Sequence, residues 1–251
     1  MSSIFVNNLK SSTGNTILIP AGHSLSLDGT IVSNDALLPS PSGNAGKLVA
    51  SNGTSLDYGE TGAKGILVFT GPGTYVPSSG TRLVHVRLVG AGGGASGYGE
   101  SGGSGGYAEG FFDMTGVSSV SITCGTGGSA TYYSGGAGTG TSTSFGSFMT
   151  ATGGRGANSS HQHCGGLPGV GSGGDFNMYG GGGSGHMYWA GPPGGSSYWG
   201  GAGATGHPQG GNYAHQHSSH APPGCGGSAG YHTSRLGANG RDGMVVVYEF
   251  R

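Results

Sequence analysis

The stretch Arg82-Leu-Val-His-Val-Arg-Leu-Val-Gly90 decides the fold class, because apolar and polar residues alternate along it with a period of two. Such alternation is typical of a β-strand, whose successive side chains point to opposite faces of a sheet. Val84, Val86 and Leu88 fall on one face, which we expect to be buried, while His85 falls on the other. The stretch therefore predicts a β-sheet with one face turned to the core.

Other stretches on both sides of it carry strand signals too. They lie at residues 65–70, 106–112, 117–124 and 243–250. The last of these, Gly-Met-Val-Val-Val-Tyr-Glu-Phe, is almost continuously apolar, which is typical of a strand in the middle of a sheet. We therefore expect the C-terminal strand to return to the sheet that residues 65–125 begin.

Glycine divides the chain, since most of its 62 glycines among 251 residues lie between positions 90 and 240. We predict two domains: an N-terminal β module over residues 1–60, serving as attachment or linker, and a glycine-rich β domain over residues 61–251. In the N-terminal module, the candidate strands are residues 15–20 and 23–28. Residues 126–240 form an insertion before the last strand. A helical period is absent, so the predicted class is all-β: small antiparallel sheet or sandwich modules carrying the insertion.

The insertion is expected to be ordered, because 33% of the chain is hydrophobic and aromatic residues recur within it. Packed extended segments, partly polyproline-II-like, would let glycine backbones approach closely while larger side chains face outward. A flexible glycine loop is the alternative. A polysaccharide- or ice-binding face of polyproline II segments would need a strict three-residue glycine period, which Gly180–Gly183, Gly185, Gly191 and Gly194 do not keep.

Charge and composition exclude several function classes. The net charge is −1, and no lysine follows Lys64, so a nucleic-acid partner is not expected. No apolar run approaches the roughly 20 residues of a membrane span, and the first residues lack the pattern of a signal peptide. The acidic residues are isolated from one another, so we predict no enzyme. The three cysteines favour buried free thiols over a disulfide or a metal pair.

Two identical histidine pairs, His161-Gln-His163 and His215-Gln-His217, are candidate metal ligands. In an extended segment, residues two apart point the same way, so each pair offers two imidazoles on one side. Three chains around an axis would bring six together, an arrangement that suits a first-row transition ion such as iron, with zinc the other candidate. The alternative is surface histidines that bind backbone carbonyls.

Tyrosine and tryptophan in glycine-rich surroundings are candidate contact residues, because they supply large contact areas with few rotors to order. They also stack on sugar rings. The alternative is that they fill a core between glycine layers. Tyr188-Trp189 and Tyr198-Trp199 are the first candidates for exposed tips. The candidate receptor-binding residues are Tyr179, Tyr188, Trp189, Tyr198, Trp199 and Tyr213.

Several stretches resemble known virion proteins. Leu38-Pro-Ser-Pro-Ser-Gly-Asn-Ala-Gly-Lys-Leu, with Tyr58 where tryptophan is usual, looks like a linker of phage tail-fibre proteins. Residues 8–23 resemble openings of cyanophage structural proteins. Residues 68–77, 86–94, 105–110 and 242–250 are similar to a glycine-rich domain of phage tail fibres, in which a small β-sheet module supports glycine-rich loops. The histidine pairs resemble those of the T-even long tail fibre, which bind iron on the trimer axis, with Cys164 and Cys225 as further candidates here.

The resemblance implies a structural protein of the virion tail fibre, most simply its distal, receptor-binding adhesin. A structural connector or decoration protein without receptor contact is the alternative. It further implies a homotrimer, attachment to other tail proteins through residues 1–60, and a host surface glycan or outer-membrane protein as the ligand. Such a protein would be made in the host cytoplasm and released by lysis.

Overall fold

The computed structural model describes residues 48–51, 56–59, 62–97, 99–132, 136–158, 164–185, 191–202, 221–230 and 236–251. The chain divides into two units, Met1–Glu60 and Thr61–Arg251. In the first unit, strands β1 (Leu48–Ser51) and β2 (Leu56–Gly59) pair as an antiparallel hairpin. The strands expected at residues 15–20 and 23–28 lie outside the described residues.

Two five-stranded antiparallel sheets belong to the second unit. The main sheet has the strand order β11-β6-β5-β12-β3, and the second sheet has the order β10-β9-β8-β7-β4. The main sheet consists of β3 (Ala63–Phe69), β5 (Leu83–Val89), β6 (Tyr107–Asp113), β11 (Phe176–Met178) and β12 (Met244–Phe250). The second consists of β4 (Gly73–Tyr75), β7 (Val120–Thr123), β8 (Thr143–Phe145), β9 (Met149–Ala151) and β10 (Gly171–Ser172). The described residues form no helix, and the expected all-β fold is confirmed.

The hydrophobic core is shared by the two sheets. Val84, Val86 and Leu88 of β5 are fully buried, as the period of two predicts. The second sheet contributes large side chains, among them Ile122 and Phe145, which are also fully buried. Each such side chain contributes about 1.5–3 kcal/mol by leaving water, so this small core holds the strands in register.

The C-terminal strand β12 lies in the middle of the main sheet, between β5 and β3. Val246 pairs with Arg87 on one side and with Val68 on the other. The last strand therefore returns to the sheet of β3, β5 and β6, as expected, whereas the strand expected at 117–124 belongs to the second sheet as β7. Strands β8 to β11 lie inside the insertion at 126–240, where the sequence indicated no separate strands.

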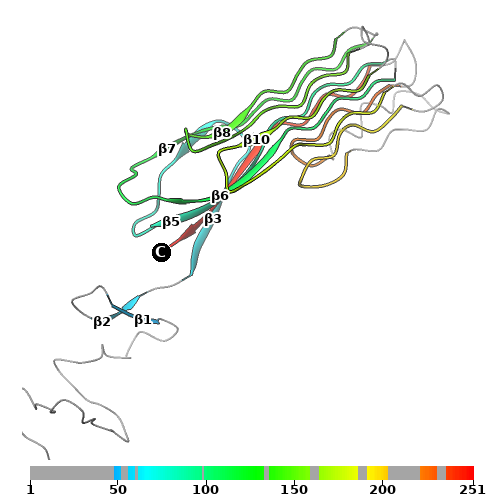
Figure 1. The fold of residues 1–251 in the computed structure, drawn as a ribbon. Coiled ribbons are helices and arrows are strands. Elements are labelled where there is room, and N and C mark those ends of the chain that lie inside the picture. Colours follow the sequence, from blue (N-terminus) through cyan, green and yellow to red (C-terminus); the bar gives the residue numbers. More distant parts are fainter. Residues whose placement is uncertain are drawn as a thin grey trace, which may run out of the picture. The chain divides into compact units, whose positions relative to one another are not determined.

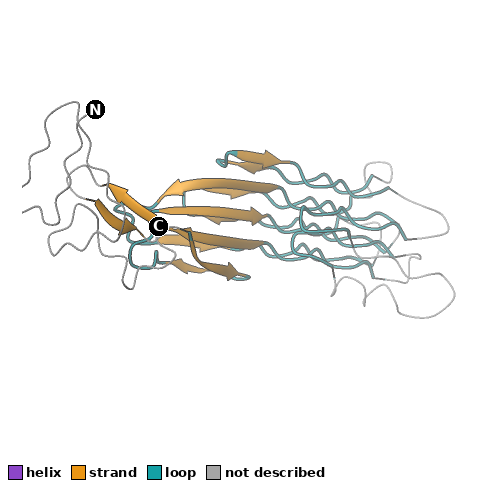
Figure 2. Cartoon of the chain, turned by 90° about the horizontal axis from the view of Figure 1, so that it is seen from below, coloured by secondary structure: helices purple, strands orange, loops and turns teal. Residues whose placement is uncertain are grey.

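Beyond the strands, the glycine-rich part of the chain forms a bundle of extended segments, which we name the glycine lattice. Figure 1 shows these segments running side by side, and Figure 2 shows strands continuing directly into them. The described lattice segments are 90–97, 99–106, 125–131, 136–142, 152–158, 164–170, 180–185, 191–196, 224–230 and 236–243.

The lattice is held by backbone hydrogen bonds that repeat every three residues. The N–H of Gly90 donates to the carbonyl of Gly106 at 2.9 Å. Three residues later, the N–H of Gly93 donates to the carbonyl of Gly103 at 2.8 Å. The two segments therefore run antiparallel, and hydrogen bonds join them at every third residue.

The residues in between face other segments. Ala91 donates to Thr141, and Gly92 donates to Arg241, each in a different segment. The carbonyls of segment 90–97 also accept from segments 125–131, 152–158 and 224–230. A repeat of three residues, with bonds only between segments, is the geometry of polyproline II. The expected polyproline-II-like packing is confirmed for the described residues, and the flexible glycine loop is excluded there.

These bonds arrange the described segments in three layers. The first layer contains 136–142, 152–158 and 164–170; the middle layer contains 125–131, 90–97, 99–106 and 180–185; the third contains 236–243, 224–230 and 191–196. Segments 90–97 and 99–106 each have neighbours on six sides. Their interior positions are therefore restricted to small residues.

Glycine is required in the middle layer because backbones meet there without side chains between them. A Cβ on Gly92 would lie 1.9 Å from the carbonyl oxygen of Cys225, and one on Gly93 would lie 2.1 Å from that of Arg155. No side chain fits at such distances. The lattice is thus a solid core made of main chain.

The lattice has two distinguishable ends. Gly90 and Gly106 adjoin β5 and β6 and mark the end that we call the sheet end. Ser96 and Glu100, which hydrogen-bond to each other through their main chains, mark the opposite or far end. Among the described residues there is no helix of sufficient length and apolar character to cross a membrane.

Candidate functional site

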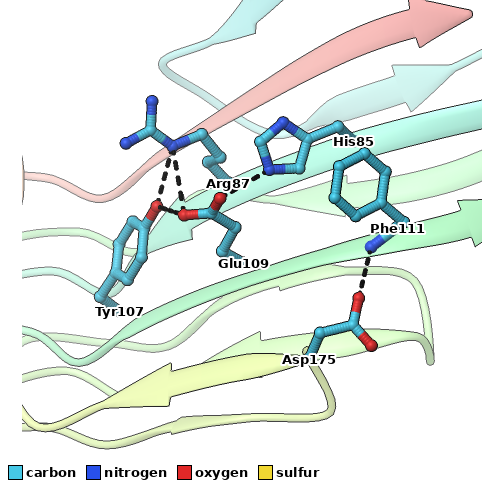
Figure 3. Close-up of polar contacts among 6 residues, drawn as sticks. All are labelled: His85, Arg87, Tyr107, Glu109, Phe111 and Asp175. Atoms are coloured by element: carbon cyan, nitrogen blue, oxygen red, sulfur yellow. Dashed lines mark hydrogen bonds and ion pairs between the residues drawn. The ribbon is translucent and has the colours of Figure 1, made fainter.

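The outer face of the main sheet carries the side chains of β5 and β6 that do not enter the core (Figure 3). Glu109 is at the centre of this cluster. It pairs with the His85 imidazole at 2.8 Å, and it accepts a hydrogen bond from the Tyr107 hydroxyl. Arg87 Nε donates to the Tyr107 hydroxyl at 2.8 Å and lies 3.5 Å from Glu109. These four residues form one polar network.

The network controls the ionisation of its members. Burial opposes the charged form of Glu109, but the hydrogen bonds from Tyr107 and His85 outweigh it and lower the pKa of the carboxyl. Burial and the bond to Glu109 raise the pKa of Tyr107. Glu109 is therefore a carboxylate, and Tyr107 is a neutral donor, across the range of ordinary pH.

Tyr198 and Trp199 pack against this network. The Tyr198 ring stacks on Tyr107 with 3.6 Å between centroids, and the Arg87 guanidinium carbon lies 4.6 Å from the centre of the Trp199 ring. Tyr198 is 45% exposed. The indole Nε1 of Trp199 is buried and has no hydrogen-bond partner in the described structure. The sequence placed this pair at an exposed tip, whereas the structure places it on the outer face of the main sheet.

The flanking half of this face is apolar and accessible. Phe111 stacks on His85 with 4.5 Å between ring centres and is 53% exposed, and Phe176 is 50% exposed. Tyr179, at the end of β11, is 71% exposed. The described structure records no ring contact for Tyr179, so it does not join the Tyr198–Trp199 cluster.

The remaining candidate contact residues and all four candidate metal ligands lie outside the described residues. They are Tyr188, Trp189, Tyr213, His161, His163, His215 and His217. Their flanks are described, and these flanks lie in different places. Asn158 and Cys164, which pair across residues 159–163, are at the far end. Residues 202 and 221 are instead near the turn at 197–200, since Gly200 adjoins Pro222.

The described cysteines do not support one common metal cluster. Cys124 and Cys225 are buried, as expected, but Cys164 is exposed. The Cys225 thiol donates towards the carbonyl of Gly200 at 3.6 Å. Among described residues, no three histidine, cysteine or acidic side chains gather where they could hold a metal. The metal site at the histidine pairs stays a prediction.

A buried carboxylate at the far end was missed from the sequence. Glu100 is fully buried, and its carboxylate accepts a hydrogen bond from Ser96 Oγ. The signal for it is its position, because Glu100 is the one acidic residue within the run of small residues that forms the middle layer. The network of Arg87 and Glu109 was also missed, although the period of two does place His85 and Arg87 on the non-core face.

Comparison with known proteins finds one family, whose model covers both the strands and the lattice. Residues 69–249 match the model of a family described as a glycine-rich domain. This range begins at the end of β3, includes the whole lattice, and ends within β12. The chain matches none of the curated proteins. Since the matched range exceeds half of the sequence, the chain belongs to the glycine-rich domain family.

Proposed function

We propose that this protein is a structural component of a virion tail fibre and acts as its distal adhesin. The proposal assigns attachment to other tail proteins to residues 1–60 and contact with the host to the chain connections at the far end. The same hypothesis includes assembly as a homotrimer and release from the host by lysis. Its ligand is a surface glycan or an outer-membrane protein.

The observation that carries the proposal is the position of the chain connections. Residues 97–99, 132–136, 158–164, 185–191 and 230–236 all have their described flanks at the far end of the lattice. A lattice whose backbone groups bond to one another supports such connections without constraining their sequence. Antibodies use a comparable division, in which a regular scaffold holds variable contact loops rich in Tyr, Ser and Gly.

The composition of these connections fits the same role. Residues 186–190 contain Tyr188 and Trp189, and Tyr132, 54% exposed, precedes residues 133–135. Aromatic side chains give large contact areas at small entropic cost. The chain has few charges, which suits a neutral or weakly charged ligand surface better than a nucleic acid.

A connector or decoration role is the second candidate, and one observation favours it. The main sheet exposes apolar side chains on its outer face, including Ile66 at 62%, Val68 at 57% and Phe111 at 53%. Contiguous apolar surface of this kind marks contacts with other proteins. In this role, the sheet face would be covered by a neighbouring virion protein.

The two roles are separated by the binding of purified full-length protein to a panel of bacterial strains. The test variant is Tyr188→Ala combined with Trp189→Ala, which leaves the lattice segments intact. Val76→Ala is the matched control, since Val76 is 61% exposed beside β4 at the sheet end. An adhesin loses cell binding in the double variant and keeps it in the control. Binding to no strain, or equal binding by all three proteins, would overturn the adhesin role.

A further inference from the structure

A groove lies on the outside of the first layer, away from the aromatic cluster of the main sheet. It has a volume of about 460 Å³ and is bounded by residues 136–139, 155–158 and 164–167. These stretches belong to the three segments of the first layer, near the far end. The groove is therefore on the lattice itself, and its lining is fixed by main-chain hydrogen bonds.

One residue of the groove lining, Gly156, has main-chain groups for which the described lattice has no hydrogen bond. Segment 152–158 donates from Arg155 to Leu167 and from Ala157 to Gly94, in two different segments. In the three-residue repeat of this segment, Gly153 and Gly156 are the residues whose main-chain groups face neither of these two segments. The N–H and C=O groups of these two glycines have no partner in the described structure. Of the two, Gly156 lines the groove.

Arg155 supplies the charge of the groove. Its side chain is exposed, and in the described structure it has neither a hydrogen bond nor an ion pair. Its main chain is fixed on both sides, because its N–H donates to Leu167 at 2.8 Å and its carbonyl accepts from Gly103 at 3.0 Å. Such fixing lowers the entropic cost of binding. Because the neighbouring residues Gly154 and Gly156 have no side chains, they leave the guanidinium uncovered.

The rest of the described lining is uncharged, with two polar side chains that can donate a hydrogen bond through oxygen or nitrogen. The described groove-lining residues include Thr139 with its hydroxyl and Asn158 with its amide, and none of those described is acidic. Leu167, 60% exposed, adds an apolar edge. A lone guanidinium among neutral donors favours an anionic oxygen group, since guanidinium binds carboxylate and phosphate through paired hydrogen bonds. The apolar edge suits the carbon face of a sugar ring.

We propose that this groove binds an acidic saccharide, with its anionic group at Arg155 and its ring against Leu167. The inference rests on the proposed function, because it takes the ligand from the host surface. It assigns a ligand class to a site on the first layer that adjoins two of the connections at the far end, 132–136 and 158–164. The shared chemistry is an anionic oxygen on a sugar, carried either by a uronic acid or by a sugar phosphate.

Calorimetric titration of the full-length protein tests the inference with three probes. They are tetragalacturonate, its fully methyl-esterified neutral form, and glucose 6-phosphate. We expect tetragalacturonate to bind, its neutral ester to bind at least about tenfold more weakly, and the affinity to fall as salt is raised. Binding of glucose 6-phosphate but not of tetragalacturonate would also support the inference and would identify phosphate as the source of the charge.

Three variants locate the binding. Arg155→Gln removes the charge and Thr139→Trp fills the groove, so each is expected to weaken binding by about tenfold or more. Arg82→Gln makes the same charge change on an exposed arginine next to β5, outside the groove, and is expected to bind like the unmodified protein. Circular dichroism confirms that each variant is folded. Equal affinity for acid and ester, unchanged affinity in Arg155→Gln, or no binding of any probe overturns the inference.

The outcome is distinguishable from that of the adhesin test. If the groove binds no probe while Tyr188 and Trp189 remain necessary for cell binding, the groove inference fails and the adhesin role stands. If Arg155 is necessary for binding the saccharide but the protein binds no cell, the groove is a saccharide site and the adhesin role fails.

Discussion

Arg87 and Trp199, although separated by more than a hundred residues in the sequence, are in contact, with the guanidinium carbon 4.6 Å from the centre of the indole ring. Arg87 belongs to β5, whereas Trp199 follows the lattice segment 191–196. The contact therefore attaches the turn at 197–200 to the main sheet. Because Arg87 also bonds to Tyr107, the turn is connected to the polar network of Glu109.

Arg87→Met tests this attachment, since methionine keeps the length and apolar character of the side chain but removes its charge. We expect a loss of about 2 kcal/mol in the free energy of unfolding, from the cation–π contact and the charged hydrogen bond together. Chemical denaturation measures it. Arg82→Met is the matched control on an exposed arginine and should change the stability by less than about 0.5 kcal/mol. Equal losses in both variants would contradict the attachment.

The lattice makes the effect of alanine depend on its position. Gly93→Ala would place a Cβ 2.1 Å from the carbonyl oxygen of Arg155, and we expect a loss of about 3 kcal/mol or more. In the same lattice, Gly182 has no atom within 4 Å of its Cβ position. Gly182→Ala should be neutral or should stabilise by up to about 1 kcal/mol, through the lower entropy of the unfolded chain. Thermal melting of the two variants compares them, and similar melting temperatures would rule out the close packing.

The strands could be predicted from the sequence because their signals are local. The period of two in residues 82–90 identified Val84, Val86 and Leu88 as core residues, and the apolar run at 243–250 identified a central strand. The pairing of these two strands, which are more than 150 residues apart, could be inferred only because an apolar strand requires neighbours on both sides. The short strands β8 and β9 were missed, since three residues are too few to show a period.

The three-residue repeat of the lattice could not be recognised from the spacing of its glycines. A strict glycine period is expected only where a segment has neighbours on one side. Gly92 and Gly93 both contact other backbones, because segment 90–97 has neighbours on six sides. Glycine and other small residues are therefore needed at nearly every position, which conceals the repeat. The contact between Arg87 and Trp199 was unpredictable for a different reason, since it depends on where the lattice returns to the sheet.

Acid should destabilise the protein through Glu249. This carboxylate accepts hydrogen bonds from the Tyr75 hydroxyl at 2.7 Å and from Ser78 Oγ at 2.6 Å. Burial opposes its ionisation, but the bonds from Ser78 and Tyr75 prevail and lower its pKa. A lowered pKa stabilises the folded state above the unfolded value of about 4.3, and this contribution is lost as pH falls through the folded value.

Glu249→Gln removes this pH-dependent contribution. At pH 7 the variant should be about 1–3 kcal/mol less stable, because its neutral amide forms weaker bonds to Ser78 and Tyr75. The two stability curves should approach each other as the pH falls below the unfolded value of about 4.3, and they should meet below the lower folded value, where the carboxyl of the unmodified protein is protonated too. Denaturation with urea at several pH values measures both curves. A constant difference between pH 3 and pH 7 would show that Glu249 does not contribute through its charge.

The three thiols should differ in their reactivity. Cys164 is exposed, whereas Cys124 and Cys225 are buried. Burial also raises the pKa of the Cys124 thiol, which keeps it in its unreactive protonated form. A thiol reagent should therefore modify Cys164 rapidly in the folded protein and the other two only after unfolding. Mass spectrometry identifies the labelled cysteine, and rapid labelling of Cys225 would contradict the packing of its thiol against Gly200.

The same reaction tests the predicted metal site, because Cys164 directly follows His161-Gln-His163. If these histidines bind Zn²⁺, with or without the thiol, the ion should slow the labelling of Cys164, and a chelator should restore the rate. His161→Ala combined with His163→Ala should label at the same rate with and without Zn²⁺. The double variant His215→Ala with His217→Ala is the matched control. The described residues that flank this pair, 202 and 221, lie near the turn at 197–200, whereas those that flank the first pair lie at the far end. If Zn²⁺ does not change the labelling rate of the unmodified protein, the result argues against a site at His161 and His163. If both double variants lose the protection equally, all four histidines share one site.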